Sequence, residues 1–142
     1  MLGADLAPQL ESYSDVVSYI LKPAAAVTGG QRPVVFVRGK NECKGAFAAR
    51  LCEYICPLSY SFYGKISYGP LEAVGLDNGV TDQDGYGEYQ GLNMFESVRS
   101  AQLAALSEMD AFEGQYRMVF AASGQISDEI DSQLNRIGAA LA

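Results

Sequence analysis

The spacing of hydrophobic and polar residues changes several times along the chain, and each pattern predicts an element. Apolar side chains three and four residues apart predict an amphipathic helix that has Pro8 in its first turn and that Pro23 ends. The apolar run at 34–37 predicts a strand buried on both faces, and 44–56 then predicts a mostly buried helix. Strict alternation over 60–68 predicts a strand with one exposed face.

The second half begins with a segment, at about 69–91, that is rich in Gly, Asp and Tyr and has no sustained period. We expect it to form a long loop, of the kind that is usually functional or mobile. A helix is predicted from Leu92 to Phe112, and 115–123 predicts a further strand. Ser127 is placed to cap a last amphipathic helix.

These elements predict an α/β fold in which a small three- to four-stranded sheet is layered with about four helices. Their order is α-β-α-β-loop-α-β-α. A further strand within 71–75 would give the central order β-α-β-β-α-β, the ferredoxin-like split, and both arrangements stay open. The length of 142 residues, of which 49% are hydrophobic, predicts a single domain, 1–142. No apolar run approaches the roughly 20 residues that span a membrane, so we expect no membrane association.

Charge and composition narrow the class of function. The net charge is −7, with a balance of +2 over 1–68 and −9 over 69–142, which disfavours nucleic acid as a partner. Three cysteines in a chain of this size predict a reducing, cytoplasmic compartment, or a particle assembled there. Histidine is absent, which removes the commonest general base and metal ligand. We therefore expect a protein without enzymatic activity, cofactor or metal.

Basic residues gather at the junction between the 34–37 strand and the helix that follows it. The order of strand, lysine-containing loop and helix resembles the P-loop NTPases, and this resemblance implies phosphate binding. With Lys44 at the motif lysine, the motif glycines and the Mg²⁺-binding hydroxyl are replaced by other residues. One hypothesis is therefore a degenerate nucleotide- or anion-binding site without hydrolysis, formed by Arg38, Lys40, Cys43 and Lys44 at a positive helix end.

The same junction supports a second alternative. Its segments PVVFVRG and ECKGAF resemble the monothiol glutaredoxins over about 20 residues. The resemblance implies that Cys43 is a nucleophilic thiol whose pKa a helix N-terminus and Lys44 would lower. The chain departs from that family because no Thr-x-Pro segment follows the junction.

Carboxylates and tyrosines are interleaved in the 69–91 segment. The series Asp82-x-Asp84-Gly85 copies the middle of an EF-hand loop, but both anchoring ligand positions are missing, so no metal site is expected. Tyrosine is enriched at protein interfaces, and carboxylates would attract a basic partner. The residues expected to bind a partner are Asp77, Asp82, Asp84, Tyr86, Glu88 and Tyr89.

These observations favour a non-enzymatic protein–protein interaction or assembly protein. Its expected partners are other protein subunits or a second copy of the chain. A structural component of a larger particle, such as part of a virion neck or tail, would fit this class. The nucleotide- or anion-binding domain and the glutaredoxin-like thiol protein are the two alternatives.

Overall fold

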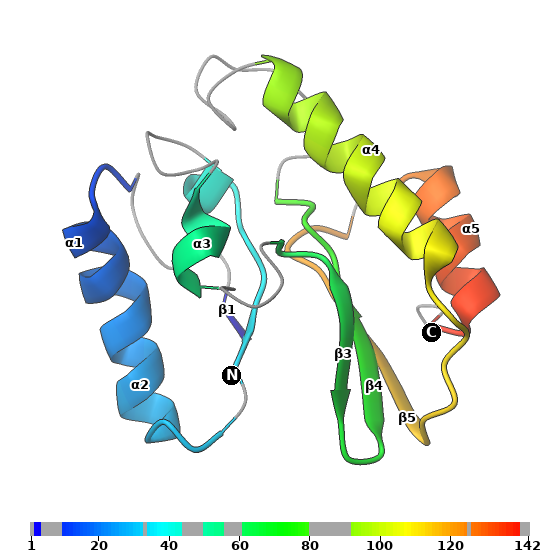
Figure 1. Cartoon of the computed structure of the whole chain (residues 1–142), viewed down its shortest axis with the longest axis horizontal. Coiled ribbons are helices and arrows are strands. Elements are labelled where there is room, and N and C mark those ends of the chain that lie inside the picture. The colour runs from blue at the N-terminus through cyan, green and yellow to red at the C-terminus, as the bar shows by residue number, and fades with distance from the viewer. Residues whose placement is uncertain are drawn as a thin grey trace.

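The elements form two groups that lie side by side in the computed structural model of the chain (Figure 1). The structure describes residues 2–3, 10–32, 34–43, 50–55, 61–79, 92–124 and 126–139. One group contains the N-terminal helices and a two-stranded sheet, and the other contains a three-stranded sheet and two helices. The chain thus has an α/β fold with a small mixed sheet, which confirms the predicted class.

A continuous helical segment opens the first group. It consists of α1 (Tyr13–Val16), a wide π-helical turn called η1 (Val17–Leu21) and α2 (Lys22–Thr28). Ser12 caps its first turn by accepting a hydrogen bond from the Asp15 N–H, and the Asp15 carboxylate accepts one from the Ser12 N–H in return. This reciprocal capping box satisfies backbone donors that have no partner inside the helix.

Pro23 does not end this segment, contrary to the prediction. The wide turn precedes it, and the Lys22 N–H donates to the carbonyl of Val17, five residues earlier. A wider turn accommodates a ring that has no N–H to donate and that would collide with a carbonyl in a regular helix. The segment continues for five residues beyond Pro23 and ends at Gly29, whose φ of 62° is left-handed.

The rest of the first group is built from short elements. β1 (Leu2–Gly3) pairs in parallel with β2 (Val35–Phe36), and a single 3₁₀ turn, η2 (Asn41–Cys43), follows β2. α3 (Leu51–Ile55) lies within the predicted 44–56 helix, whose first six residues and last residue fall outside the described ranges. These elements share one apolar cluster, formed by Leu10, Val16, Ile20, Phe36, Leu51 and Phe62.

The second group is organised by a three-stranded sheet in the order β3-β4-β5. β3 (Gly64–Tyr68) and β4 (Leu71–Gly75) form an antiparallel hairpin, and β5 (Tyr116–Phe120) is parallel to β4. Gly69 occupies the hairpin turn with a φ of 56°, a conformation that favours glycine. The predicted loop at about 69–91 is therefore wrong at its start, because five of its residues form β4.

The pairing of β4 and β5 also argues against the ferredoxin-like arrangement. A ferredoxin-like sheet is antiparallel throughout, whereas β4 and β5 run in the same direction. In addition, β2 pairs with β1 and belongs to a different sheet. The extra strand within 71–75 is real, but the sheet it joins is not the ferredoxin-like one.

Two helices cover one face of this sheet (Figure 1). α4 (Leu92–Glu108) connects β4 to β5, and α5 (Asp128–Ile137) follows β5 and packs beside α4. Ser127 caps α5 by accepting a hydrogen bond from the Ile130 N–H, as predicted. The residues buried between helices and sheet are Val74, Leu76, Leu106, Phe112, Ile130, Leu134, Ile137 and Ala139.

Among the helices that the structure describes, none is long and apolar enough to cross a membrane.

Candidate functional site

Charged and amide side chains meet at one edge of the fold. The parallel strands β4 and β5 end at this edge, and the segment that follows β2 reaches it from the other group. In open α/β sheets the carboxyl ends of the strands are the usual location of a binding site. We call the residues here the carboxyl-edge cluster: Arg38, Asp77, Asn78 and Gln102.

A buried ion pair lies at the centre of the carboxyl-edge cluster. Arg38 Nε donates to Asp77 Oδ1 at 3.1 Å, and Arg38 Nη2 contacts Asp77 Oδ2. Arg38 is 3% exposed and Asp77 is 6% exposed, so little solvent reaches either charge. The two forked contacts have the bidentate geometry that arginine forms with carboxylates. The pair links residues 39 positions apart and joins the two groups of elements.

The surroundings of the pair hold both charges in place. The Arg38 guanidinium lies over the ring of Phe62, 4.7 Å from its centroid. The Asp77 N–H donates to Gln102 Oε1 at 2.6 Å, which ties the end of β4 to the middle of α4. Burial raises the pKa of the Tyr63 phenol, and the nearby negative charge of Asp77 raises that pKa further.

The residues after Asp77 fasten the same edge. Asn78 Oδ1 accepts hydrogen bonds from the N–H groups of Ala122 and Ser123, and Asn78 Nδ2 donates to the Ser123 carbonyl at 2.7 Å. At Gly79, an added Cβ would lie 2.3 Å from the Arg38 carbonyl oxygen. Only glycine allows the backbone after β4 to approach the backbone after β2 this closely.

The residues predicted to bind an anion lie in different environments. Arg38 is buried against Asp77, so a carboxylate of the chain already compensates its charge. Lys40 is exposed, while Cys43 is completely buried in the η2 turn. Lys44 lies outside the described residues. The geometry therefore does not gather these four residues on one accessible surface, within the part of the chain that is described.

Cys43 and Cys52 are free thiols with different surroundings. Cys43 has no exposed surface, which separates it from any substrate in solution. Cys52 is half-buried, and its burial raises the pKa of its thiol more strongly than the charge of Arg38 lowers it. A raised pKa keeps Cys52 protonated at neutral pH and makes it a poor nucleophile.

The predicted partner-binding residues have one described member. Asp77 is interior and paired with Arg38, so it faces the core of the carboxyl-edge cluster rather than solvent. The other five, Asp82, Asp84, Tyr86, Glu88 and Tyr89, lie outside the described residues. No group of three or more potential metal-binding side chains occurs among the residues that the structure does describe.

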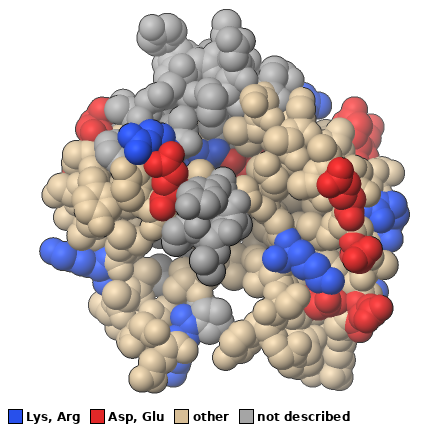
Figure 2. Space-filling view, in the orientation of Figure 1, with Lys and Arg blue, Asp and Glu red and all other residues tan. Residues whose placement is uncertain are grey.

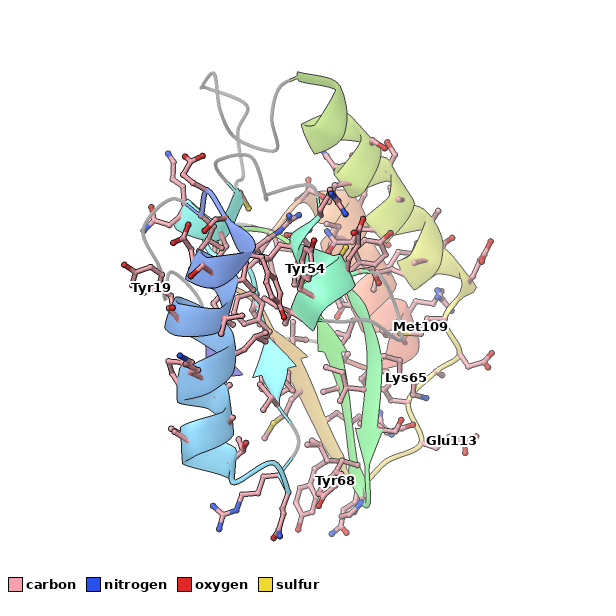
Figure 3. All side chains as sticks on the ribbon, turned by 60° about the vertical axis from the view of Figure 1, so that its left-hand side comes forward. Tyr19, Tyr54, Lys65, Tyr68, Met109 and Glu113 are labelled. Carbon is pink, nitrogen blue, oxygen red and sulfur yellow. The ribbon has the colours of Figure 1, made fainter. Side chains whose placement is uncertain are left out.

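An apolar surface that the sequence analysis did not identify lies on the three-stranded sheet. Strand alternation places Tyr68, Leu71, Tyr116 and Met118 on the face opposite to Val74 and Val119, which pack against the α4–α5 side. Tyr68 and Tyr116 lie on either side of Leu71 in register, and Tyr68 lies at the hairpin end of the sheet (Figure 3). We call these four residues the sheet patch.

Three of the four side chains of the sheet patch are exposed to solvent. Tyr68 is 60% exposed, Tyr116 54% and Met118 48%. Isolated exposed apolar residues are common, but adjacent ones on a single sheet face form a contiguous surface of the kind that binds other proteins. The sequence signal was the alternation in the fifth strand, where Tyr116, Met118 and Phe120 share one side.

The surface near α4 and α5 differs from the sheet patch in charge. Carboxylates gather on the side that these helices form (Figure 2). The exposed acidic residues of this region are Glu108, Asp110, Glu113, Asp128, Glu129 and Asp131. In sequence, three of the four sheet-patch residues lie within 69–142, the part of the chain with the charge balance of −9, and Tyr68 directly precedes it.

No family model, no curated protein and no solved structure matches this chain.

Proposed function

We propose that this protein is a non-enzymatic interaction or assembly protein that binds other protein subunits through the sheet patch. The observation that carries the proposal is the exposure of Tyr68, Tyr116 and Met118 on one sheet face. Tyrosine and methionine are enriched at the centres of protein interfaces, because both offer a large contact area. A role as a structural component of a larger particle, such as a virion neck or tail, belongs to the same proposal.

Charge indicates the chemistry of the partner. The chain has a net charge of −7, and exposed carboxylates gather beside α4 and α5 (Figure 2). Such a surface attracts a basic protein over several ångströms and raises its association rate. We infer a partner that places apolar side chains on the sheet patch and that carries a net positive charge.

Paired substitutions test the sheet patch. The double variant Tyr116→Ser/Met118→Ser removes both exposed apolar side chains of β5, and Tyr19→Ser removes a tyrosine of similar exposure, 46%, from the helical segment. Each tagged protein would be incubated with extract of its native host, and bound proteins would be quantified by mass spectrometry. We expect the double variant to retain at least roughly tenfold less of a basic protein that wild type and Tyr19→Ser capture equally.

The capture assay needs a control that shows that all three proteins are folded. Circular dichroism should show the same secondary structure for all three proteins, because the substituted side chains are largely exposed. If every captured protein binds the double variant as strongly as it binds wild type, the sheet patch is not the binding surface.

The segment that contains Tyr86 and Tyr89 remains a second expected contact. Replacing both tyrosines by alanine should leave the free energy of unfolding within about 1 kcal/mol of wild type. We expect the same change to weaken association at least roughly tenfold, since interface aromatics contribute strongly to binding. Urea denaturation and the capture assay measure the two effects separately. Unfolding of the double variant would place these tyrosines in the core instead.

A further inference from the structure

The backbone of β5 uses only half of its hydrogen-bonding groups inside the sheet. The Tyr116 N–H donates to the Pro70 carbonyl at 3.1 Å, and the Phe120 carbonyl accepts from the Leu76 N–H at 2.8 Å. In a parallel ladder, alternate residues of a strand bond to the same neighbour. The backbone groups of Arg117 and Val119 therefore point away from β4.

This outer side of β5 is an open edge. β5 is the last strand in the order β3-β4-β5, and the outward N–H and C=O groups of Arg117 and Val119 have no hydrogen-bond partner among the described residues. Arg117 is exposed and Met118 is 48% exposed, so the edge is accessible from solvent. Open edges of this kind pair readily with another strand.

We infer that β5 pairs in antiparallel fashion with β5 of a second copy of this chain, which joins two three-stranded sheets into one of six strands. This inference rests on the proposed function, because it identifies a second copy as one of the subunits that the protein binds. The two-fold axis would pass between the two Met118 residues. Each Arg117 would then lie opposite Val119 of the second copy.

The hydrogen-bond pattern of this register is self-complementary. In an antiparallel ladder, a hydrogen-bonded pair of residues exchanges both of its N–H···O bonds, and such pairs alternate with non-hydrogen-bonded pairs. With Met118 in the central non-hydrogen-bonded pair, the two flanking pairs each join an Arg117 to a Val119. All outward backbone groups of both residues are then used in both copies.

Side chains agree with the same register. The only charged residue of β5, Arg117, faces an apolar valine rather than another arginine. Its guanidinium bends back to its own chain, where Nε donates to the Gly114 carbonyl at 3.2 Å and Nη1 to the Gly138 carbonyl at 3.5 Å. On the opposite face, Tyr116, Met118 and Phe120 of both copies would form one continuous apolar row.

A matched pair of substitutions tests the edge itself. Arg117→Pro removes one outward N–H and keeps the ladder to β4, whereas Arg117→Ala removes the same side chain and keeps that N–H. Size-exclusion chromatography with light scattering would be run on the full chain over a range of concentrations. We expect wild type and Arg117→Ala to be dimeric, and the dimer dissociation constant of Arg117→Pro to rise at least roughly tenfold.

A cross-linking measurement tests the same strand pairing without the proline substitution, so its result does not depend on whether the proline variant folds. Central non-hydrogen-bonded pairs bring Cβ atoms to roughly 4.5–5.5 Å, a spacing that a disulfide can bridge with slight adjustment. Under mild oxidation, Met118→Cys should form a covalent dimer. Ser67→Cys, at an exposed position of β3 on the other edge of the sheet, should do so far more slowly.

Failure of this inference can be separated from failure of the proposed function. A wild-type chain that stays monomeric, without a Met118→Cys cross-link, overturns the inference even if the sheet patch captures another protein. Dimerisation that Arg117→Pro leaves unchanged, or that Ser67→Cys traps equally well, also overturns it. A dimer that depends on the β5 edge, in a chain whose sheet patch captures no other protein, supports the inference and leaves the proposed binding of other subunits unsupported.

Discussion

At the scale of single residues, we expect the stability of the fold to depend strongly on the buried Arg38–Asp77 ion pair. Both side chains are almost completely buried, so removing one charge takes away a counter-charge that bulk water cannot replace. We predict that Asp77→Asn lowers the free energy of unfolding by about 3–5 kcal/mol. Urea denaturation monitored by circular dichroism measures this loss.

The exposed pair Arg50–Glu53 supplies the matched control. Its side chains are 62% and 42% exposed, so solvent screens both charges and Glu53→Gln should cost far less than Asp77→Asn. The double variant Arg38→Met/Asp77→Asn should be more stable than Asp77→Asn alone, since the buried Arg38 charge is removed together with its Asp77 counter-charge. Equal small losses for Asp77→Asn and Glu53→Gln would show that the buried pair contributes no more to the free energy of unfolding than the exposed pair does.

Glu72 should make folding stability depend on pH. Its carboxylate accepts hydrogen bonds from Lys65 and from the N–H groups of Gly114 and Glu113, and these interactions hold the pKa of Glu72 below its ordinary value of 4.5. A pKa that is lower in the folded state stabilises the fold above the unfolded-state pKa, and this stabilisation is lost as the pH falls through the folded-state pKa.

We therefore predict that Glu72→Gln is less stable than wild type at neutral pH and that the difference shrinks with acidification. Unfolding free energies of both proteins, measured from about pH 7 down to about pH 3, would test this. The stability difference should begin to shrink when the pH falls below 4.5, the ordinary pKa of this side chain. A constant difference across the series would contradict a role for the ionised carboxylate.

At the scale of elements, local patterns were predicted well and long-range ones were not. Ser127 and the apolar stripe of α5 follow from neighbouring residues alone, and the structure confirms both. The prediction that Pro23 ends the first helix is wrong, because the π-helical turn before it changes which N–H groups bond to which carbonyls. The strand at Leu71–Gly75 was only an alternative, because its two glycine-rich flanks resemble a loop.

The approach of the segment after β4 to the segment after β2 gives a further prediction. A Cβ at Gly79 would meet backbone atoms of Arg38 and Gly39, which cannot move aside cheaply. Gly79→Ala should therefore destabilise the protein by about 1–3 kcal/mol or more. Gly124→Ala is the matched control, because its Cβ would meet nothing within 4 Å, and it should change stability by no more than about 0.5 kcal/mol. Equal thermal shifts in the two variants would contradict the close approach.

At the scale of the whole molecule, the candidate sites depend on contacts between distant parts of the chain. Arg38 and Asp77 were assigned from the sequence to two different sites, and the fold brings them into one ion pair. Nothing local to either residue indicates the other, since 39 positions separate them. The sheet patch was missed for a related reason: which face of a strand is covered depends on where the helices pack.

Because the chain has a net negative charge, dimerisation and the binding of a basic partner should respond to salt in opposite directions. Each copy carries −7, so two copies repel each other, and screening by salt reduces that repulsion. Binding of a basic partner is driven partly by attraction, which the same screening weakens. We predict that raising sodium chloride from about 0.05 M to about 0.5 M strengthens dimerisation, as measured by sedimentation equilibrium, and weakens capture of a basic partner. Chloride is preferred to sulfate here, because sulfate would also strengthen apolar contacts. If salt instead dissociates the dimer, ion pairs rather than strand pairing hold the two copies together.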